Sequence, residues 1–547
     1  MSNKVLIVGG VAGGATAAAR LRRLDESATI IMFEKGDYIS YANCGLPYYI
    51  GDTITDKEKL TLQTPKSFHQ RFNVDVRVSN EVISIDRQAK TVTVQTSTGS
   101  DYVETYDALI LSPGAEPFVP RVDGSQNENV FILRNIPDTY KIKDFCNQKK
   151  PATAVVVGAG YIGIEMAENL HALGIEVTIV EMADHAIGPL DYDMACEIHG
   201  HIRSKGVNLL LNSALSGIKN TNGSTVIELS NGSKIPADIV IMSIGVRPET
   251  SLAKKAELSM NSRGSIIVNE NMLTSDPNIY AVGDAVEVID FNTGKPAFIP
   301  LAGPANKQGR IAADNLCGVK SRYTGTQGSA ILKCFDMTVA LTGMNERQAI
   351  SEGINYEKSF TFSSSHASYY PGSTFMSIKF IFEKISGKVL GAQITGYDGV
   401  DKRCDVIATA IRAGMTVDEL ADLELCYAPP FSSAKDPVNM AAYVAQNLIN
   451  GNSKIFHWHD VTDLDLGKVT LLDTRTAGEF DNGTIPGSIN IPVDEIRARA
   501  NEIDKSKPVY AFCGIGLRGY VACRVLTQMG FEAINLSGGY RLWKTII

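Results

Sequence analysis

The sequence contains no run of about 18 apolar residues, so no segment is predicted to span a membrane. It has no Cys-x-x-Cys pair and no histidine and cysteine cluster at the spacing of a zinc site, which predicts that no metal is bound. The nine cysteines are scattered and odd in number, unlike a disulfide framework. We therefore expect a protein with reduced thiols that works in the cytoplasm.

Positive charge is scarcer than negative charge, with 52 Lys and Arg against 60 Asp and Glu and a net charge of −8. This balance argues against nucleic acid as a partner, and an anionic substrate would need a local basic patch. The apolar run 5–8 is short and no small-residue cleavage site follows it, which predicts a buried strand and not a signal peptide. At 547 residues the chain is too long for one core, so three or four domains are expected.

Two glycine-rich turns follow strand patterns. The first comes after the apolar residues 4–8 and precedes a helical run, 15–24, and a strand pattern, 29–33. The fingerprint of a dinucleotide site is a strand, a glycine turn, a helix and a second strand, with an acidic residue about 20 positions after the turn. The residues expected to contact the nucleotide are Gly9, Gly13, Gly14, Glu34 and Lys35. Val11 stands where the strict pattern has its second glycine, so a glycine-rich turn in a plain α/β fold remains the alternative.

The second turn has the strict spacing. Its glycines are Gly158, Gly160 and Gly163, and the strand pattern 176–180 that follows ends at Glu181. A carboxylate at this place accepts the adenosine 2′-hydroxyl and repels a 2′-phosphate, which favours NADH, although NADPH stays possible.

Two further strand patterns end in turns that could face a nucleotide. Residues 106–111 lead to Gly114, and residues 278–282 lead to Gly283 and Asp284. A carboxylate at Asp284 suits a flavin ribityl hydroxyl. A simple helix N-cap is the equally good alternative for this residue.

The order of these features resembles the flavoprotein disulfide reductases that have two dinucleotide-binding domains. The resemblance covers residues 1 to about 445 and implies FAD in the first unit, NADH in an inserted second unit and an obligate homodimer. The domains that it implies are an FAD-binding domain, 1–112 and 276–329, an NADH-binding domain, 113–275, and a dimerisation domain, 330–448.

Cys44 is the only cysteine between Glu34 and Asp56, in the stretch SYANCGLPYY. The family's CxxxxC pair is missing, and the stretch closely resembles coenzyme A disulfide reductases. That resemblance implies that Cys44 is the redox nucleophile and that Ser40 and Asn43 support the substrate. Without a resolving cysteine, Cys44 would form a mixed disulfide with the substrate or a persulfide. A thiolate is favoured near positive charge or a helix N-terminus, and a buried structural cysteine is the alternative.

Two later segments, 366–372 and 425–431, also resemble coenzyme A disulfide reductases. There each supplies a tyrosine hydroxyl to the active site of the partner subunit, which we carry over to Tyr369 and Tyr427, with Tyr370 as the alternative to Tyr369. A phenol can donate a hydrogen bond to a leaving thiolate. Aromatic packing at an interface is the simpler explanation for these side chains.

Coenzyme A carries phosphates, so an acidic protein that binds it needs local arginine or lysine. The resemblance favours Arg20, Arg23 and Arg71. A solvated helix face is as good an explanation for any one of them.

After a linker, 449–458, residues 459–547 resemble a rhodanese domain through LLDTR, IPGSINIP and the loop from Cys513 to Arg518. Backbone N–H groups and the helix after the loop would favour a thiolate or persulfide at Cys513. One departure is Thr484, where many members have histidine. A rhodanese fold without catalysis is the alternative.

The predicted fold class is α/β, with two Rossmann-like dinucleotide-binding domains, an α/β dimerisation domain and a small α/β rhodanese domain. The predicted function is NADH-dependent flavoprotein reduction of coenzyme A persulfide, polysulfide and coenzyme A disulfide, with Cys513 accepting sulfane sulfur. One alternative is an NADH oxidase or peroxidase that cycles Cys44 through a sulfenic acid, although Ala12 stands where such peroxidases have histidine. A sulfur-carrier or persulfide-sensing protein is another. The sequence leaves open whether Cys513 delivers sulfur to Cys44 directly, through coenzyme A or across the dimer.

Overall fold

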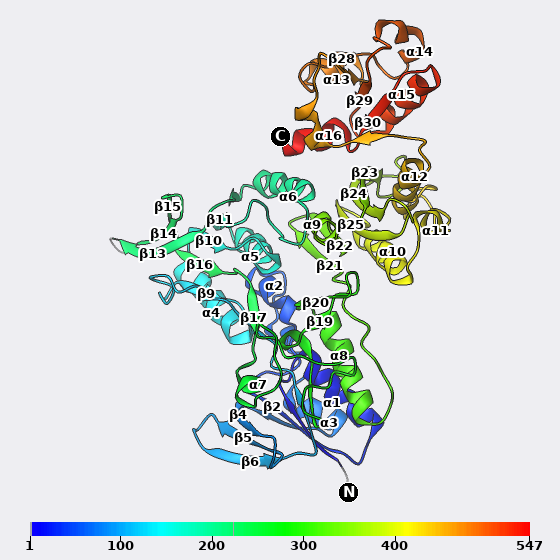
Figure 1. The fold of residues 1–547 in the computed structure, drawn as a ribbon. Coiled ribbons are helices and arrows are strands. Elements are labelled where there is room, and N and C mark those ends of the chain that lie inside the picture. The colour runs from blue at the N-terminus through cyan, green and yellow to red at the C-terminus, as the bar shows by residue number, and fades with distance from the viewer. Residues whose placement is uncertain (1–2, 222–223) are drawn as a thin grey trace. The chain divides into compact units, whose positions relative to one another are not determined.

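The computed structural model of the protein describes residues 3–221 and 224–547 and divides the chain into two compact units (Figure 1). The first unit comprises Met1–Ala183 and Val207–Gly328, and the second comprises Asp184–Gly206 and Ser329–Ile547. Each unit is described by itself. In the described ranges, no helix combines the length and the apolar character that crossing a membrane requires.

A parallel five-stranded sheet begins the first unit. Its strands, in spatial order, are β18 (Ile279–Ala281), β7 (Ala108–Leu111), β1 (Lys4–Val8), β2 (Thr29–Glu34) and β3 (Asp75–Val78). All four residues of β7 are buried, as expected for a parallel strand that is covered on both faces. The chain leaves this sheet after β7 and returns at β18, so the second nucleotide unit is an insertion.

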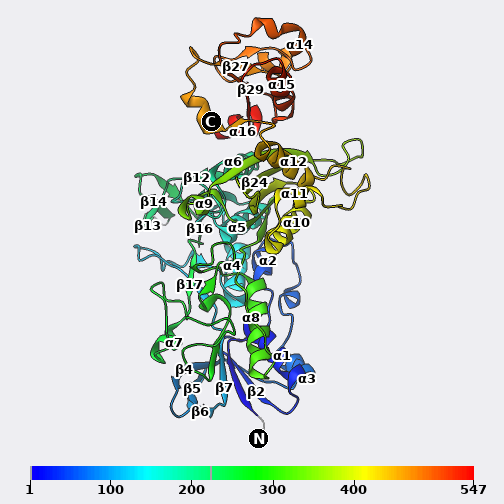
Figure 2. The same ribbon diagram turned by 45° about the vertical axis from the view of Figure 1, so that its right-hand side comes forward.

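Alternate residues of β1 enter two different cores. Val5 and Ile7 pack with α1 (Ala12–Leu24) and α8 (Ala302–Leu316), which lie side by side in both ribbon views (Figures 1 and 2). Leu6 faces the other way, toward an antiparallel meander. The remaining elements around this sheet are α2 (Leu46–Ile50), α3 (Pro65–Phe72), β4 (Asn80–Asp86), β5 (Thr91–Thr96), β6 (Asp101–Thr105), α7 (Ser251–Lys255), β19 (Val288–Ile289) and β20 (Pro296–Ala297).

The inserted part contains a second parallel five-stranded sheet. Its strands, in spatial order, are β12 (Asn208–Leu210), β11 (Glu176–Val180), β10 (Thr153–Val157), β16 (Ile239–Met242) and β9 (Val130–Ile132). The other elements of the insertion in this unit are β8 (Ala115–Pro117), α4 (Ile136–Lys149), α5 (Tyr161–Ala172), β13 (Leu215–Thr221), β14 (Ser224–Leu229), β15 (Lys234–Pro236) and β17 (Val246–Pro248).

An antiparallel five-stranded sheet lies at the centre of the second unit. Its strands, in spatial order, are β21 (Ala330–Cys334), β22 (Met337–Gly343), β25 (Val389–Gly396), β24 (Phe375–Glu383) and β23 (Tyr356–Ser364). The helices of this part are α6 (Tyr192–Ser204), α9 (Glu346–Ser351), α10 (Val400–Ala413), α11 (Val417–Ala421) and α12 (Pro437–Ile449). Helix α6 falls within the predicted NADH-binding segment but packs as part of this unit.

The C-terminal part of the second unit has a parallel sheet of its own. Its strands, in spatial order, are β26 (Ile455–Phe456), β30 (Ala533–Leu536), β29 (Val509–Phe512), β27 (Thr470–Asp473) and β28 (Ile489–Asn490). Its helices are α13 (Ala477–Asp481), α14 (Ile496–Arg499), α15 (Leu517–Gln528) and α16 (Gly539–Ile546). The predicted α/β fold class is confirmed.

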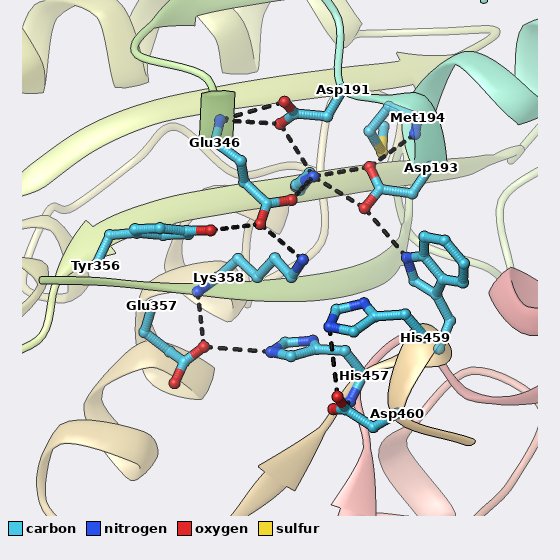
Figure 3. Close-up of polar contacts among 12 residues, drawn as sticks. Asp191, Asp193, Met194, Glu346, Tyr356, Glu357, Lys358, His457, His459 and Asp460 are labelled. Atoms are coloured by element: carbon cyan, nitrogen blue, oxygen red, sulfur yellow. Dashed lines mark hydrogen bonds and ion pairs between the residues drawn. The ribbon is translucent and has the colours of Figure 1, made fainter. Parts of the chain in front are cut away.

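A buried ammonium group joins α6 to the antiparallel sheet. Lys379 of β24 is fully buried and binds Asp191 at 2.9 Å, Asp193 at 2.7 Å and Glu346 (Figure 3). The oxygens of these three carboxylates are close enough together to hold a cation, and the Lys379 ammonium already supplies that charge. Lys358 binds Glu346 as well, at 2.7 Å. The start of α6 is therefore fixed to the sheet by opposite charges around a buried ammonium group.

We expect Lys379→Met to lower the apparent melting temperature strongly, because the substitution leaves three carboxylates without their central counter-charge. Removing one partner of a buried ion pair costs about 3–5 kcal/mol. Lys384→Met is the matched control, since Lys384 pairs with Glu357 at 3.1 Å with its side chain 47% exposed. Such a surface pair contributes about 0–1 kcal/mol. Equal shifts for the two variants in thermal unfolding would contradict a structural role of the buried cluster.

The same cluster predicts a pH dependence. Burial alone raises the pKa of Glu346, but the charges of Lys379 and Lys358 outweigh it and lower the pKa to about 2. A carboxyl with a depressed pKa stabilises the fold above its ordinary value of 4.5, and this contribution is lost as the pH falls toward 2. The difference in stability between the wild-type protein and Lys379→Met should therefore shrink below pH 4.5.

Candidate active sites

Close backbone packing shapes the first glycine turn. Gly9 has φ +97°, and a Cβ on it would lie 2.1 Å from the Ser112 carbonyl oxygen. A Cβ on Gly14 would lie 1.9 Å from the Gly9 oxygen. Neither position can carry a side chain while α1 starts this close to β1 and β7. The turn thus brings the first backbone N–H groups of α1 to the carboxyl ends of the strands.

Glu34 is fixed beside this turn. Its carboxylate accepts hydrogen bonds from the N–H of Gly10 at 3.0 Å and of Gly36 at 2.9 Å. A carboxylate has further lone pairs, so it can still accept ribose hydroxyls. Lys35 is half exposed and lies 3.9 Å from Glu249.

The second turn repeats this construction. A Cβ on Gly158 would lie 2.4 Å from the Ser243 oxygen, and one on Gly163 would lie 1.9 Å from the Gly158 oxygen. Glu181 accepts from the N–H of Ala159 at 2.7 Å and of Ala183 at 2.8 Å. Open space surrounds the Cβ position of Gly160, the residue before α5.

The starts of α1 and α5 fit phosphate groups. In the described part of the chain, no side chain caps either helix and neither first turn contains an acidic residue. Helices α3, α9, α11 and α13 differ, because each has a complete capping box. Uncapped N–H groups and the positive end of the helix dipole form a natural anion site. The two turns therefore fit two dinucleotide diphosphates.

Asp284 lies where β18 ends, in a short 3₁₀ turn, Gly283–Ala285, whose N-cap is Val282. The simple N-cap explanation for Asp284 is therefore wrong. Burial raises the pKa of its carboxyl. The turn is held by Gln308, which accepts a hydrogen bond from the Gly283 N–H at 2.7 Å. Gly114, with φ +76°, comes shortly after β7, the strand that pairs with β18.

Cys44 is solvent-exposed in a 3₁₀ turn, Asn43–Gly45, immediately before α2. Its segment is tied to the first glycine turn, since the Ser40 N–H donates to the Gly10 carbonyl oxygen at 2.8 Å. Ser40 has φ +43°, an uncommon conformation for a residue with a side chain. The glycine turn and the cysteine segment thus form one structural unit.

The charges around Cys44 oppose thiolate formation. Although the residue keeps exposed surface, partial desolvation by the surrounding chain raises the pKa of Cys44, and the carboxylates of Glu165 and Asp284 raise it further. The sequence does not reveal that two acidic residues approach this cysteine. Neutralising this local negative charge would favour the Cys44 thiolate.

Glu165 is a candidate residue that the sequence did not single out. It lies on α5, two residues after Gly163, and its Oε1 is 3.5 Å from the hydroxyl of Tyr48. Burial raises the pKa of Glu165 to about 7, against the lowering effect of Tyr48. The available signal was an acidic residue two positions after the last glycine of the second turn.

Tyr369 and Tyr427 lie together in the second unit, with their hydroxyl oxygens 3.0 Å apart. Their exposed fractions are 74% and 48%, and the hydrogen bond to Tyr427 raises the pKa of Tyr369. Tyr370 packs edge-on against His366 instead, with ring centroids 5.8 Å apart. This arrangement favours Tyr369 over Tyr370 as the partner of Tyr427.

The candidate phosphate-binding arginines have different surroundings. Arg20 pairs with Asp314 at 2.6 Å, whereas Arg23 and Arg71 are exposed. Arg22, between them in sequence, is 3% exposed and donates to backbone carbonyls, including those of Phe72 and Asn73. Arg23 and Arg71 are thus accessible to a phosphate, and Arg22 holds α1 to α3.

Cys513 follows β29 and has no exposed surface. The Gly516 N–H donates to its Sγ at 3.2 Å, just before α15 begins. Arg518 in the first turn of α15 forms a bidentate pair with Glu479, with both N···O distances 2.7 Å. That pair lowers the pKa of Glu479 to about 2. The sulfur therefore lies in a narrow loop with an amide donor and a fixed guanidinium beside it.

The LLDTR segment has a structural role. Asp473 and Arg475 form a buried pair at 2.6 Å, and the Arg475 guanidinium lies 4.1 Å from the ring centroid of Tyr540. Thr484 donates to Asp473 at 2.8 Å. The residue that departs from the rhodanese pattern therefore supports this buried pair.

Three family models match successive parts of the chain. Residues 3–309 match the pyridine nucleotide-disulphide oxidoreductases, and residues 329–437 match the dimerisation domain of that family. Residues 461–546 match the rhodanese-like domain. The first model implies a flavin and a pyridine nucleotide as cofactors.

Characterised relatives match over long stretches. The coenzyme A disulfide reductase of Staphylococcus epidermidis is 38% identical over 446 residues, which are 81% of this chain and 100% of that protein. The structure of reduced Bacillus anthracis CoADR-RHD has a TM-score of 0.97 at 50% identity, covering 100% of this chain and 98% of the other. An NAD-dependent persulfide reductase from A. fulgidus has a TM-score of 0.93 at 38% identity, covering 99% and 100%. The chain therefore belongs to the pyridine nucleotide-disulphide oxidoreductases, in a form with a dimerisation domain and a rhodanese-like domain.

Proposed function

We propose that the protein uses NADH to reduce coenzyme A persulfide and related polysulfides, and also coenzyme A disulfide. One observation carries the proposal: an exposed cysteine without a resolving partner lies beside two dinucleotide turns, and the same chain holds a second cysteine in an amide-lined loop. The relatives named for coenzyme A disulfide and persulfide reduction support this choice of substrate.

Cys44 performs the thiol chemistry. Its thiolate attacks the coenzyme A sulfur of the persulfide, the S–S bond breaks, HS⁻ leaves and a mixed disulfide Cys44–S–S–CoA forms. With coenzyme A disulfide, the leaving group is a coenzyme A thiolate. FAD, when bound at the first turn, supplies the two-electron transfer from NADH. The net reaction is NADH + H⁺ + CoA–S–SH → NAD⁺ + CoA–SH + H₂S.

The two turns and the arginines select the nucleotides and the substrate. The first turn, with Glu34 and Asp284, would hold FAD. The second, with Glu181, would hold NADH, and the single carboxylate disfavours the 2′-phosphate of NADPH without excluding it. Arg23 and Arg71, together with Arg20, would bind the phosphates of coenzyme A.

The tyrosine pair would act in a homodimer. Tyr369 and Tyr427 are exposed with their hydroxyls in contact, which suits a pair that donates to a thiolate in the site of the partner subunit. The dimerisation-domain match supports the homodimer. None of the nine cysteines forms a disulfide, which favours a reducing compartment such as the cytoplasm.

Cys513 would collect the sulfur atom. Its thiolate attacks the outer sulfur of a donor R–S–S⁻, R–S⁻ leaves and Cys513–S–S⁻ remains, stabilised by the Gly516 N–H. The thiolate of coenzyme A then takes this sulfur and frees Cys513. The enclosed loop favours a small transferred group over a bulky one.

Two other functions compete with this proposal. An NADH oxidase or peroxidase would cycle Cys44 through a sulfenic acid, and a sulfur carrier would show a stable Cys513 persulfide without steady NADH turnover. The rhodanese-like domain argues against an oxidase or peroxidase. The glycine turn at Gly158, which fits a dinucleotide, argues against a sulfur carrier without NADH turnover. NADH consumption with oxygen alone, compared with coenzyme A persulfide, separates all three.

We expect Cys44→Ser to lower NADH turnover with every disulfide and persulfide by on the order of 10³-fold, because no other thiol replaces the nucleophile. Cys317→Ser is the matched control, a partly buried cysteine near the end of α8, and should keep near-wild-type turnover. Turnover that survives in Cys44→Ser would refute the scheme.

We expect Cys513→Ser to abolish sulfur transfer from thiosulfate to cyanide while leaving NADH-dependent reduction of coenzyme A disulfide within about twofold of wild type, because that substrate needs only Cys44. Thiocyanate formation and NADH absorbance report the two activities. Loss of both activities would argue that the two cysteines act in one obligatory step.

We expect Glu165→Gln to make the Cys44 thiol ionise at lower pH, because a negative charge that raises its pKa is removed. The effect should grow as the pH rises through 7, where Glu165 itself ionises. Iodoacetamide labelling of the Cys44 peptide at a series of pH values measures it. Glu176→Gln, at an exposed position of β11, is the control. An unchanged labelling profile would remove Glu165 from the site.

A further inference from the structure

Helix α16 holds the Cys513 loop from one side. The Tyr540 N–H donates to the Cys513 carbonyl oxygen at 2.7 Å, and the Arg541 N–H donates to that of Gly514 at 2.9 Å. A Cβ on Gly539 would lie 2.5 Å from the same Cys513 oxygen. The first turn of α16 and the loop that carries the sulfur are therefore packed as one piece.

The side chain of Arg541 points to the dimerisation domain. Its guanidinium carbon lies 5.1 Å from the ring centroid of Phe362 on β23 and 5.9 Å from that of Phe375 on β24. A guanidinium over an aromatic face is attracted by the negative potential of the ring. One residue thus contacts the sulfur loop through its backbone and the neighbouring domain through its side chain.

Apolar packing reinforces this contact. Leu542, 1% exposed, shares a buried cluster with Met194, Phe360 and Phe362, and Ile515 of the Cys513 loop packs against that cluster. The Phe360 N–H donates to Ser537 Oγ at 3.2 Å. The loop therefore borders a cluster that contains residues of both domains.

The linker before the rhodanese-like domain also contacts the rest of the second unit. Trp458 donates to Asp193 at 3.4 Å, and His457 Nε2 lies 3.2 Å from a carboxylate oxygen of Glu357 (Figure 3). Asp193 is in turn bound to Lys379 of the sheet. These contacts limit the freedom of the rhodanese-like domain to turn away from the dimerisation domain.

We propose that Arg541 is a positioning residue for sulfur transfer at Cys513, and that Phe362 and Phe375 of the dimerisation domain set its place. The inference rests on the proposed sulfur-accepting function of Cys513. With the guanidinium fixed, the Arg541 N–H holds the Gly514 carbonyl and keeps the loop in the form that presents the Gly516 N–H to sulfur. Reaction rates are sensitive to such placement, since an error of about 1 Å can cost on the order of 10²-fold.

The test measures sulfur transfer from thiosulfate to cyanide by the full-length protein. In it, the Cys513 thiolate takes the outer sulfur of thiosulfate and releases sulfite, and cyanide then removes that sulfur as thiocyanate. We expect Arg541→Ala to lower kcat about tenfold with KM for thiosulfate within about twofold. Arg541→Lys should recover part of kcat, because an ammonium also binds aromatic faces. Reduction of coenzyme A disulfide should stay unchanged in both variants.

Lys505→Ala is the matched control. Lys505 makes a cation–π contact with Phe531 at 5.5 Å inside the rhodanese-like domain, away from the Cys513 loop. This variant should keep the wild-type kcat. A loss equal to that of Arg541→Ala would show general destabilisation of the domain and would overturn the proposal.

Substitutions on the other domain complete the test. Phe375→Leu is the safer choice because Phe375 is 52% exposed, whereas Phe362 is buried. We expect Phe375→Leu to lower kcat for sulfur transfer. In the double variant with Arg541→Ala, kcat should fall little further than in Arg541→Ala alone, because the effects of substitutions at residues in contact are not additive. An unchanged kcat in Phe375→Leu and Phe362→Leu, with coenzyme A disulfide reduction intact, overturns the inference. Transfer that survives Cys513→Ser overturns the proposed function instead.

Discussion

The first unit depends on how closely backbone approaches backbone at Gly9 and Gly14. With no Cβ at either place, α1 starts against the ends of β1 and β7, and its uncapped N–H groups would be available to a nucleotide. Glu34 is then fixed by the turn's own N–H groups, and Ser40 is bound to the carbonyl of Gly10. Cys44 comes four residues later, so the position of the thiol follows from the nucleotide turn. A side chain at Gly9 would therefore disturb the cofactor site and the redox site together.

The two sulfurs have opposite surroundings, which fits the division of labour proposed for them. Cys44 is exposed and has carboxylates near it, so a large thiol substrate can reach it but thiolate formation is disfavoured until those charges are neutralised. Cys513 is enclosed, with an amide N–H on its sulfur and Arg518 fixed by Glu479. A small transferred sulfur suits the second environment, and a mixed disulfide suits the first.

Local sequence patterns made much of the fold and of the two nucleotide turns predictable. The strand, glycine turn and acidic residue locate Glu34 and Glu181, because those features lie within one short segment of chain. Glu165 was missed because its approach to Cys44 depends on the packing of α5 against a segment more than a hundred residues earlier. The carboxylates around Cys44 could not be predicted from the sequence for the same reason. The Lys379 cluster and the Arg541 contact also join distant segments, which spacing alone cannot pair.

One hairpin of the dimerisation domain connects two of the candidate sites. Strands β23 and β24 pair Ser364 with Phe375, and the connection between them carries Tyr369. Phe362 and Phe375, at this same end of the hairpin, hold Arg541 and through it the Cys513 loop. A shift of the hairpin would move the tyrosine hydroxyl and the sulfur loop together. The hairpin thus has a reason to be rigid, since it carries Tyr369 and also contacts Arg541 of the helix that holds the Cys513 loop.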